Sequence, residues 1–254
     1  SGAGAGKTFA LIESMKYVIR EYEIHLKKHN QKIVCITYTN VATKEVIERL
    51  GNTDLVLVST IHERIWGLIK DYQKELVEIH KDKLQEEISN IKLKLETDRD
   101  YSPFQELEHD QKEYFKEIMI DNKELYYENY YTNAADLRKA FKTHLNHYPN
   151  ILKNVSKFRK IVNAIYNLEK LTKCCENISL NKSGYNNVEY NSVYNIDKLH
   201  KMQISHDTLL DYSLRIIEKY DVLKQIIIDK YPFVFIDEYQ DTNDKIIQIM
   251  SHLE

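Results

Sequence analysis

The sequence of 254 residues contains little cysteine, proline, glycine or tryptophan, with three, three, six and one of these residues. Three cysteines, two of them adjacent at Cys174 and Cys175, do not make a disulfide framework, and none has partners at zinc-ligand spacing. We therefore expect a reduced, cytoplasmic protein. No run approaches the roughly 18 uninterrupted apolar residues that a membrane helix requires. No basic segment followed by an apolar one opens the chain, so we expect neither a membrane span nor a secretory signal.

An excess of positive charge is also missing, because the formal net charge is −3. Proteins that bind nucleic acid over a large surface are usually basic, so any DNA site here must be a local groove. The apolar fraction of 43% and the charged fraction of 30% are those of a folded globular protein. The length allows one or two hydrophobic cores.

Half of the six glycines lie within the first six residues, directly before Lys7 and Thr8. The segment 1–8 fits the phosphate-loop pattern G-x-x-x-x-G-K-[ST] at seven of eight positions, with Ser1 in place of the first glycine. Glycines let backbone N–H groups curl around an anion, and the following helix N-terminus adds partial positive charge. Lys7 would contact the β- and γ-phosphates of ATP, and the Thr8 hydroxyl would bind Mg²⁺. The candidate phosphate-binding residues are Gly2, Ala3, Gly4, Ala5, Gly6, Lys7 and Thr8.

The apolar pattern after this loop alternates between helix and strand. Helical spacing follows Thr8, a buried strand is expected at 32–37, and a helix ends at Gly51. A second strand is expected from the apolar run 55–58 and ends at Ser59-Thr60. Strand, helix and strand in this order predict a parallel sheet. A strand should also precede the phosphate loop, so we expect the chain to have been trimmed at its start.

The segment 66–231 is rich in Lys, Glu, Asn and Tyr and has long helical patterns without strand alternation. Apolar residues at heptad spacing from Val77 to Leu95 predict a long helix that packs against another helix or against a docking partner. The polar stretch Asn181 to Asn195 is expected to be an exposed loop. We interpret this whole segment as a helical insertion.

Strand character returns at 233–236 and leads directly into Asp237 and Glu238. A carboxylate pair at the end of an apolar strand suits the second half of a phosphoryl-transfer site. Asp237 would hold Mg²⁺, and Glu238 would orient and deprotonate the attacking water. Alone, the pair could be an exposed acidic turn, and the phosphate loop could be a turn that only caps a helix. The two motifs support each other, because ligands of parallel sheets bind at the carboxyl ends of the strands.

Four motifs resemble those of the UvrD/Rep-like superfamily 1A DNA helicases, a group that includes the RecB- and AddA-like motors. In chain order they span residues 2–8 (GAGAGKT), 36–40 (ITYTN), 59–62 (STIH) and 237–243 (DEYQDTN). The last motif is the most specific to this group. The motifs cover about a tenth of the chain, and their order matches that of the family.

The resemblance implies a RecA-like P-loop NTPase sheet with a large, mostly helical inserted subdomain. It predicts motor segments at 1–65 and 232–254 and the insertion at 66–231. It implies ATP-driven movement along single-stranded DNA, typically 3′ to 5′, with separation of single/double-strand junctions. Gln240 would sense the γ-phosphate. The DNA track would be formed by Tyr38, Thr39, Asn40, Thr60 and His62. On chemistry alone, Tyr38 could instead be a core or lid aromatic, and His62 a structural histidine.

The family's second motor domain, with arginines that reach the γ-phosphate, is expected outside these residues. An arginine supplied to such a transition state raises the rate by roughly 10³–10⁵, so this chain alone should bind ATP weakly and hydrolyse it negligibly. Phe9 follows the Gly-Lys-Thr motif, where many relatives of the UvrD type have arginine.

Two alternatives to a DNA-translocating motor remain open. The chain could be a nucleotide-gated DNA-binding switch without unwinding, or a vestigial motor whose insertion serves as a protein-interaction arm. Intact Lys7, Thr8, Asp237 and Glu238 argue against a vestigial site. The pathway, and any nuclease or repair partner, are not determined by the sequence.

Overall fold

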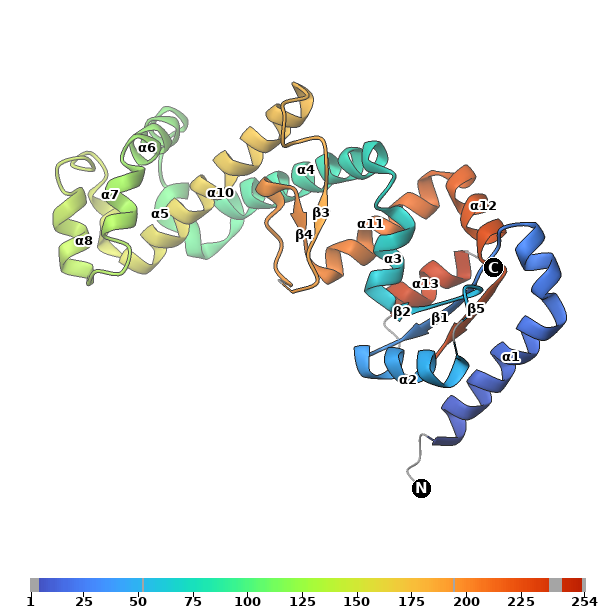
Figure 1. The fold of residues 1–254 in the computed structure, drawn as a ribbon. Helices are drawn as coiled ribbons and strands as arrows, with labels where there is room; N and C mark the ends of the chain where they lie inside the picture. Colours follow the sequence, from blue (N-terminus) through green and yellow to red (C-terminus); the bar gives the residue numbers. More distant parts are fainter. Residues whose placement is uncertain (1–4, 52, 194, 238–243, 253–254) are drawn as a thin grey trace. The chain divides into compact units, whose positions relative to one another are not determined.

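The computed structural model describes residues 5–51, 53–193, 195–237 and 244–252. These residues form an α/β protein with many helices and a small parallel sheet (Figure 1). The chain divides into two compact units. Unit 1 comprises the residues up to His80 and those from Ser183 onward, and unit 2 is Lys81–Lys182. Within the described ranges, no helix is long and apolar enough to span a bilayer.

Unit 1 contains a three-stranded parallel sheet in the order β2-β1-β5. The strands are β1 (Ile33–Thr37), β2 (Val56–Thr60) and β5 (Phe233–Ile236). All three expected strands are confirmed, and β2 ends at Thr60, where the sequence predicted its end. The expected end of the intervening helix is also confirmed, because Gly51 follows α2 with a φ of 77°, a backbone angle that glycine tolerates best.

Every residue of β1 is buried, so both faces of the sheet are covered at its central strand. Helices α1 (Ala5–Lys28) and α2 (Asn40–Leu50) lie on one face, and α3 (Ile61–Ile69), α11 (His206–Lys219) and α13 (Asp244–His252) lie on the other (Figure 1). The core beneath α1 and α2 consists of apolar residues from the helices and strands, namely Ile12, Met15, Val18, Leu26, Ile33, Cys35, Val46, Leu55 and Val56.

The remaining described elements of unit 1 are α12 (Asp221–Lys230), the start of α4 (Gln73–Thr97), a 3-10 turn at Leu199–Lys201, and two short strands. The strands β3 (Glu189–Tyr190) and β4 (Gln203–Ile204) pair in parallel. The expectation of a fully exposed loop at 181–195 was therefore wrong in part. Val188, just before β3, and Ile204 of β4 are each only 1% exposed. The burial of these two apolar side chains holds the otherwise polar segment against the protein.

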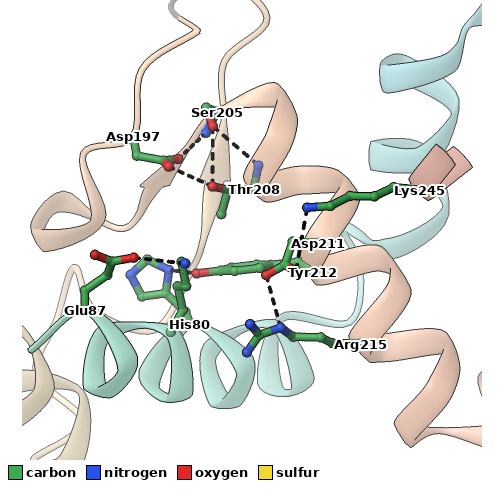
Figure 2. Close-up of polar contacts among 10 residues, drawn as sticks. His80, Glu87, Asp197, Ser205, Thr208, Asp211, Tyr212, Arg215 and Lys245 are labelled. Carbon is green, nitrogen blue, oxygen red and sulfur yellow. Dashed lines mark hydrogen bonds and ion pairs between the residues drawn. The ribbon is translucent and has the colours of Figure 1, made fainter. Parts of the chain in front are cut away.

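A buried polar network fastens this segment to α4 and α11 (Figure 2). The imidazole of His80 is fully buried, with Nδ1 2.8 Å from the Tyr212 hydroxyl and Nε2 2.9 Å from the Leu199 carbonyl oxygen. The Asp197 carboxylate accepts hydrogen bonds from the Ser205 N–H and from a threonine hydroxyl on α11. Buried polar groups are tolerated when they are paired in this way.

Unit 2 is entirely helical apart from its turns. Besides the rest of α4, it contains a 3-10 turn at Arg99–Tyr101, α5 (Ser102–Gln105), α6 (His109–Asp121), α7 (Lys123–Glu128), α8 (Ala134–Phe141), α9 (Pro149–Lys153) and α10 (Val155–Ser179). Its core is rich in aromatic side chains, and Tyr126 lies at the centre, with ring centroids 5.5–6.3 Å from those of Tyr166, Phe158 and Phe141. These aromatic contacts pack together with aliphatic side chains such as Leu137, Ile151 and Ile161.

The expected long helix is confirmed as α4, in which Leu84 and Leu95 are buried. The compact units do not follow the motor and insertion boundaries expected from the sequence, since residues 66–80 and 183–231 belong to unit 1. Compact units are defined by how tightly residues pack, whereas an insertion is defined by comparison with the family. The compact units therefore do not test the boundaries at 65/66 and 231/232, which stay a prediction.

Candidate nucleotide and DNA site

Lys7 and Thr8 lie in the first turn of α1, which begins at Ala5. This turn contains no acidic residue, so no carboxylate on the helix offsets the partial positive charge of its N-terminus. Gly2, Ala3 and Gly4 lie outside the described residues. The described part of the motif is thus a helix N-terminus with a lysine and a hydroxyl beside it, an arrangement that suits an anionic ligand.

Helix α1 runs antiparallel to the strands. The ring of Tyr22, near the end of the helix, lies 5.1 Å from that of Phe233, the first residue of β5. The first turn of α1 therefore points toward the edge of the sheet at which β5 ends (Figure 1). Asp237 follows β5 at that same edge, and its side chain is partly buried. Glu238 and Gln240 lie outside the described residues, so their convergence with Lys7 and Thr8 stays a prediction.

The first DNA-track motif forms a hydrogen-bonded turn between β1 and α2. Thr37 is fully buried, and its hydroxyl oxygen lies 2.6 Å from that of Thr43 and 3.3 Å from the Thr39 carbonyl oxygen. The Thr39 hydroxyl caps α2 by accepting a bond of 3.1 Å from the Ala42 N–H. Tyr38, between them, is 38% exposed. The turn therefore presents an aromatic ring to solvent on a rigid base.

The second motif begins another capped helix. Thr60 ends β2, and its backbone N–H donates to the Glu63 carboxylate at 3.3 Å, one turn into α3. Arg64 Nε donates to the Ser59 hydroxyl at 3.1 Å. The sequence assigned Thr39 and Thr60 to DNA contacts, and the structure gives both a capping position. The two assignments are compatible, because a hydroxyl that accepts one hydrogen bond still has a proton to donate.

The strand register brings these motifs level with one another. Thr37 pairs with Thr60, and Ile36 pairs with Ile236. The chain therefore leaves β1, β2 and β5 at the same edge, where Tyr38, Ile61 and Asp237 are the next residues. Asp237 and the first residues of the DNA-track motifs thus lie at one edge of a single sheet, where ligands of parallel α/β proteins bind.

An aromatic cluster that the sequence did not reveal surrounds His62. The centroid of its imidazole lies 4.4 Å from that of His206 at the start of α11, with 31° between the rings. Tyr190 of β3 contacts His206, and Trp66 of α3 contacts Tyr190, with centroid distances of 5.5 and 5.8 Å. These four residues come from three separate elements. No motif or spacing in the sequence signals their proximity.

The electrostatics of two groups are perturbed near this edge. Burial and the His206 imidazole lower the pKa of His62, and the Asp207 carboxylate acts in the opposite direction. Burial raises the pKa of the Cys35 thiol to about 12, with a further contribution from the Asp237 carboxylate. Cys35 is therefore an inert core residue, and Asp237 lies close enough to influence it.

The candidate donors suit Mg²⁺ bound to a nucleotide. Mg²⁺ usually takes one or two carboxylates together with substrate phosphates and waters, rather than an all-protein cage. Asp237 and the Thr8 hydroxyl would supply such a partial set. In the described ranges, no group of three or more His, Cys, Asp or Glu side chains could hold a metal ion, so a protein-only metal centre is not formed there.

Comparison with known proteins agrees with the motif pattern. The UvrD/REP helicase N-terminal domain matches the chain over residues 1–254. The Gabija protein GajB of Bacillus cereus (strain HuB5-5) is 72% identical over 254 residues, which are all of this chain and 37% of that relative. The chain thus spans little more than a third of the relative's length. The match over the whole chain shows that it belongs to the UvrD/Rep helicase family.

Proposed function

We propose that this chain carries the ATP-Mg²⁺ and single-stranded DNA sites of a helicase that moves 3′ to 5′ and separates strands at single/double-strand junctions. Membership of a helicase family supports an ATP-driven motor in general. The proposal of ATP and DNA sites in this chain is supported by one observation. The strands β1, β2 and β5 all end at the same edge of the sheet. That edge brings the DNA-track candidates and Asp237 within one local structure.

Each candidate residue has a distinct role in this proposal. Lys7 and the first turn of α1 bind the β- and γ-phosphates, while Thr8 and Asp237 hold the magnesium ion. When bound, Mg²⁺ neutralises charge on the transferring phosphoryl group. Glu238 orients the attacking water and accepts its proton, and Gln240 responds to the γ-phosphate. No described acidic residue in the first turn of α1 competes with the phosphates.

Coupling between the two sites would run along β1. The Asp237 N–H bonds to the Ile36 carbonyl oxygen at 2.9 Å, and Thr37 and Tyr38 follow directly. A shift of Asp237 on ATP hydrolysis would therefore reach the DNA track through one backbone hydrogen bond. Tyr38 would stack on a base, a contact that tolerates any sequence because every base has a π-face.

We further propose a RecA-like motor interrupted by a helical insertion at 66–231. The all-helical unit 2, Lys81–Lys182, falls within that segment and supports this architecture. The second motor domain would belong to a part of the polypeptide beyond these residues. The coverage of only 37% of the relative supports this view.

The proposal is tested in the full-length protein with three variants. Lys7→Ala should weaken ATP binding, and Glu238→Gln should preserve ATP binding while abolishing unwinding. Lys16→Ala is the control, because Lys16 lies on the same helix, where its ammonium pairs with Glu13 on the surface. Duplexes with 3′ or 5′ single-stranded tails report the direction of movement.

Unwinding by Glu238→Gln at the rate of the unmodified protein would contradict the proposed role of this carboxylate. ATP-dependent changes in DNA affinity without any strand separation by the unmodified protein would instead support a nucleotide-gated DNA-binding switch. Preference for a 5′ tail would overturn the direction only.

A further inference from the structure

His62 is one half of a stacked pair of imidazoles. It lies in the first turn of α3, two residues after the Thr60 cap, and its ring centroid is 4.4 Å from that of His206. His206 is the first residue of α11, far away in the sequence. Both side chains are partly exposed, so the pair borders solvent instead of filling the core. A ligand can therefore reach His62 while its ring stays stacked against His206.

His206 is in turn held by its own contacts. Its Nδ1 lies 2.6 Å from the Tyr190 hydroxyl oxygen, and its backbone N–H donates to the Asn195 side-chain oxygen at 2.9 Å. Burial raises the pKa of Tyr190 to about 12, with a smaller contribution from the Glu63 carboxylate. Tyr190 therefore keeps its proton at neutral pH and can donate it to His206 Nδ1. A neutral His206 then carries its ring proton on Nε2.

The other ionisable groups around the pair are few. Asp207, next to His206 on α11, favours a positive charge on His62, whereas His206 opposes one. On α3, Glu63 bonds to the Thr60 backbone and Arg64 to Ser59, so both are engaged with their own motif. Removing the His206 imidazole is thus the change that most directly alters the surroundings of His62.

We propose that His206 and Tyr190 are positioning residues for a contact between His62 and the sugar-phosphate backbone of DNA. Stacking against His206 fixes the plane of the His62 ring, and the hydrogen bond with the Tyr190 hydroxyl fixes the His206 ring. This inference rests on the proposed DNA-binding function. It assigns a role to residues from β3 and α11, which the motif pattern does not include.

The arrangement has a chemical consequence for the DNA contact. At neutral pH, His62 meets a phosphate oxygen as a neutral hydrogen-bond donor and adds no cation to the interface. Each cation that neutralises a phosphate of single-stranded DNA adds about 0.7 to the slope of log affinity against log salt. A neutral contact adds little to this slope, so the His62 contact itself should depend little on salt.

The test uses two substitutions in the full-length protein. His206→Phe keeps a ring against His62 and removes the second imidazole, and Tyr190→Phe removes only the hydroxyl. Histidine-selective isotope labelling, with the His62 signal assigned through His62→Gln, follows the ring titration without DNA. We expect the His62 midpoint to rise in His206→Phe. Tyr131→Phe, at a residue 95% exposed in unit 2, is the control for Tyr190→Phe.

Affinity for single-stranded DNA supplies the second readout. Near pH 6, His206→Phe should steepen the salt slope by up to ~0.7, which corresponds to a ~2.5-fold greater loss of affinity for a four-fold rise in salt. The double variant with His62→Gln should lose this extra slope. Tyr190→Phe should shift the pH profile in the same direction but by less.

The outcomes separate this inference from the proposed function. Failure of the unmodified protein to bind single-stranded DNA would overturn the proposed function, and the DNA contact of His62 with it. An unchanged His62 titration in His206→Phe, with normal DNA binding, would overturn the positioning role alone. A changed titration with an unchanged DNA profile would show a stack that does not serve DNA, which also overturns the inference.

Discussion

The backbone N–H of Asp237 donates a hydrogen bond of 2.9 Å to the carbonyl oxygen of Ile36. This bond continues the pairing of β5 with β1 by one residue, to the point where both strands leave the sheet. Asp237 is a candidate magnesium ligand, and Ile36 begins the first DNA-track motif. The mechanical stiffness of the turn that follows Ile36 should therefore matter for both sites.

Replacing Thr37 by valine should destabilise unit 1. The Thr37 hydroxyl is fully buried and bonds to Thr43 and to the Thr39 carbonyl oxygen. Its loss should cost about 1–3 kcal/mol of unfolding free energy, because buried partners lose a hydrogen bond. Urea denaturation measures this change. Thr37→Ser, which keeps the hydroxyl, should lose less stability than Thr37→Val, and an equal loss would contradict the hydrogen-bond explanation.

Replacing Tyr38 by alanine should weaken binding of single-stranded DNA and leave stability nearly unchanged. The ring is 38% exposed, and base stacking on an aromatic side chain contributes about 1–3 kcal/mol. The affinity should fall by roughly 5- to 150-fold. Fluorescence anisotropy with a labelled oligonucleotide measures it. Tyr38→Phe should bind nearly as well as the unmodified protein, and a Tyr38→Ala variant with full affinity would remove Tyr38 from the DNA track.

Replacing Tyr212 by phenylalanine should destabilise the junction between α4 and α11. Both Tyr212 and His80 are fully buried, and the hydroxyl oxygen lies 2.8 Å from His80 Nδ1 (Figure 2). The variant leaves Nδ1 of a buried imidazole without this partner, at a cost of about 1–3 kcal/mol. Thermal or urea denaturation measures the loss. Tyr17→Phe, at an exposed tyrosine of α1, is the control and should have little effect.

The stability of the protein should also depend on pH through His80. Burial lowers the pKa of His80 below the ordinary value of 6.5, although the Leu199 carbonyl and Asp197 act in the opposite direction. The unfolded chain then binds more protons than the folded one at mildly acidic pH. The contribution is complete above pH 6.5 and is lost as the pH falls below that value, with a slope of up to about 1.4 kcal/mol per pH unit.

Urea denaturation between pH 7.5 and 5.5 tests this expectation, with His80→Gln as the comparison. The variant should be less stable at pH 7.5 but should lose less stability on acidification. Because the pKa of His62 is also lowered, some pH dependence should remain in the variant. An identical pH dependence in both proteins would show that His80 makes no contribution.

Replacing Tyr126 by alanine should destabilise unit 2 more than a substitution on its surface. This ring is fully buried among Phe141, Phe158 and Tyr166, and its hydroxyl lies 3.2 Å from the Asn163 side-chain oxygen. Large-to-alanine changes of aromatic core residues cost about 3–5 kcal/mol. Hydrogen exchange of α7 and α10 amides would report the loss, and Tyr131→Ala, at an exposed ring, should leave this exchange unchanged.

The sequence alone determined the strands at 33–37 and 233–236, the capped end of α2 at Gly51, and the family to which the chain belongs. These features depend on neighbouring residues: an apolar run, a glycine that accepts a positive φ, and motifs whose chemistry requires given residues at given spacing. Gly2, Ala3, Gly4, Glu238 and Gln240 were also assigned from sequence, and these residues lie outside the described structure.

Only the tertiary structure decided which side chains surround His62 and how the polar segment after Ser183 is held. His206 reaches His62 because α11 packs beside α3, and Tyr190 of β3 contacts His206 in turn. His80 and Tyr212 meet for a similar reason, since α4 and α11 bring their buried faces together. The contacts of His62 with His206 and of His80 with Tyr212 join residues more than a hundred positions apart. Their energy comes from burial and pairing in three dimensions, which no local pattern encodes.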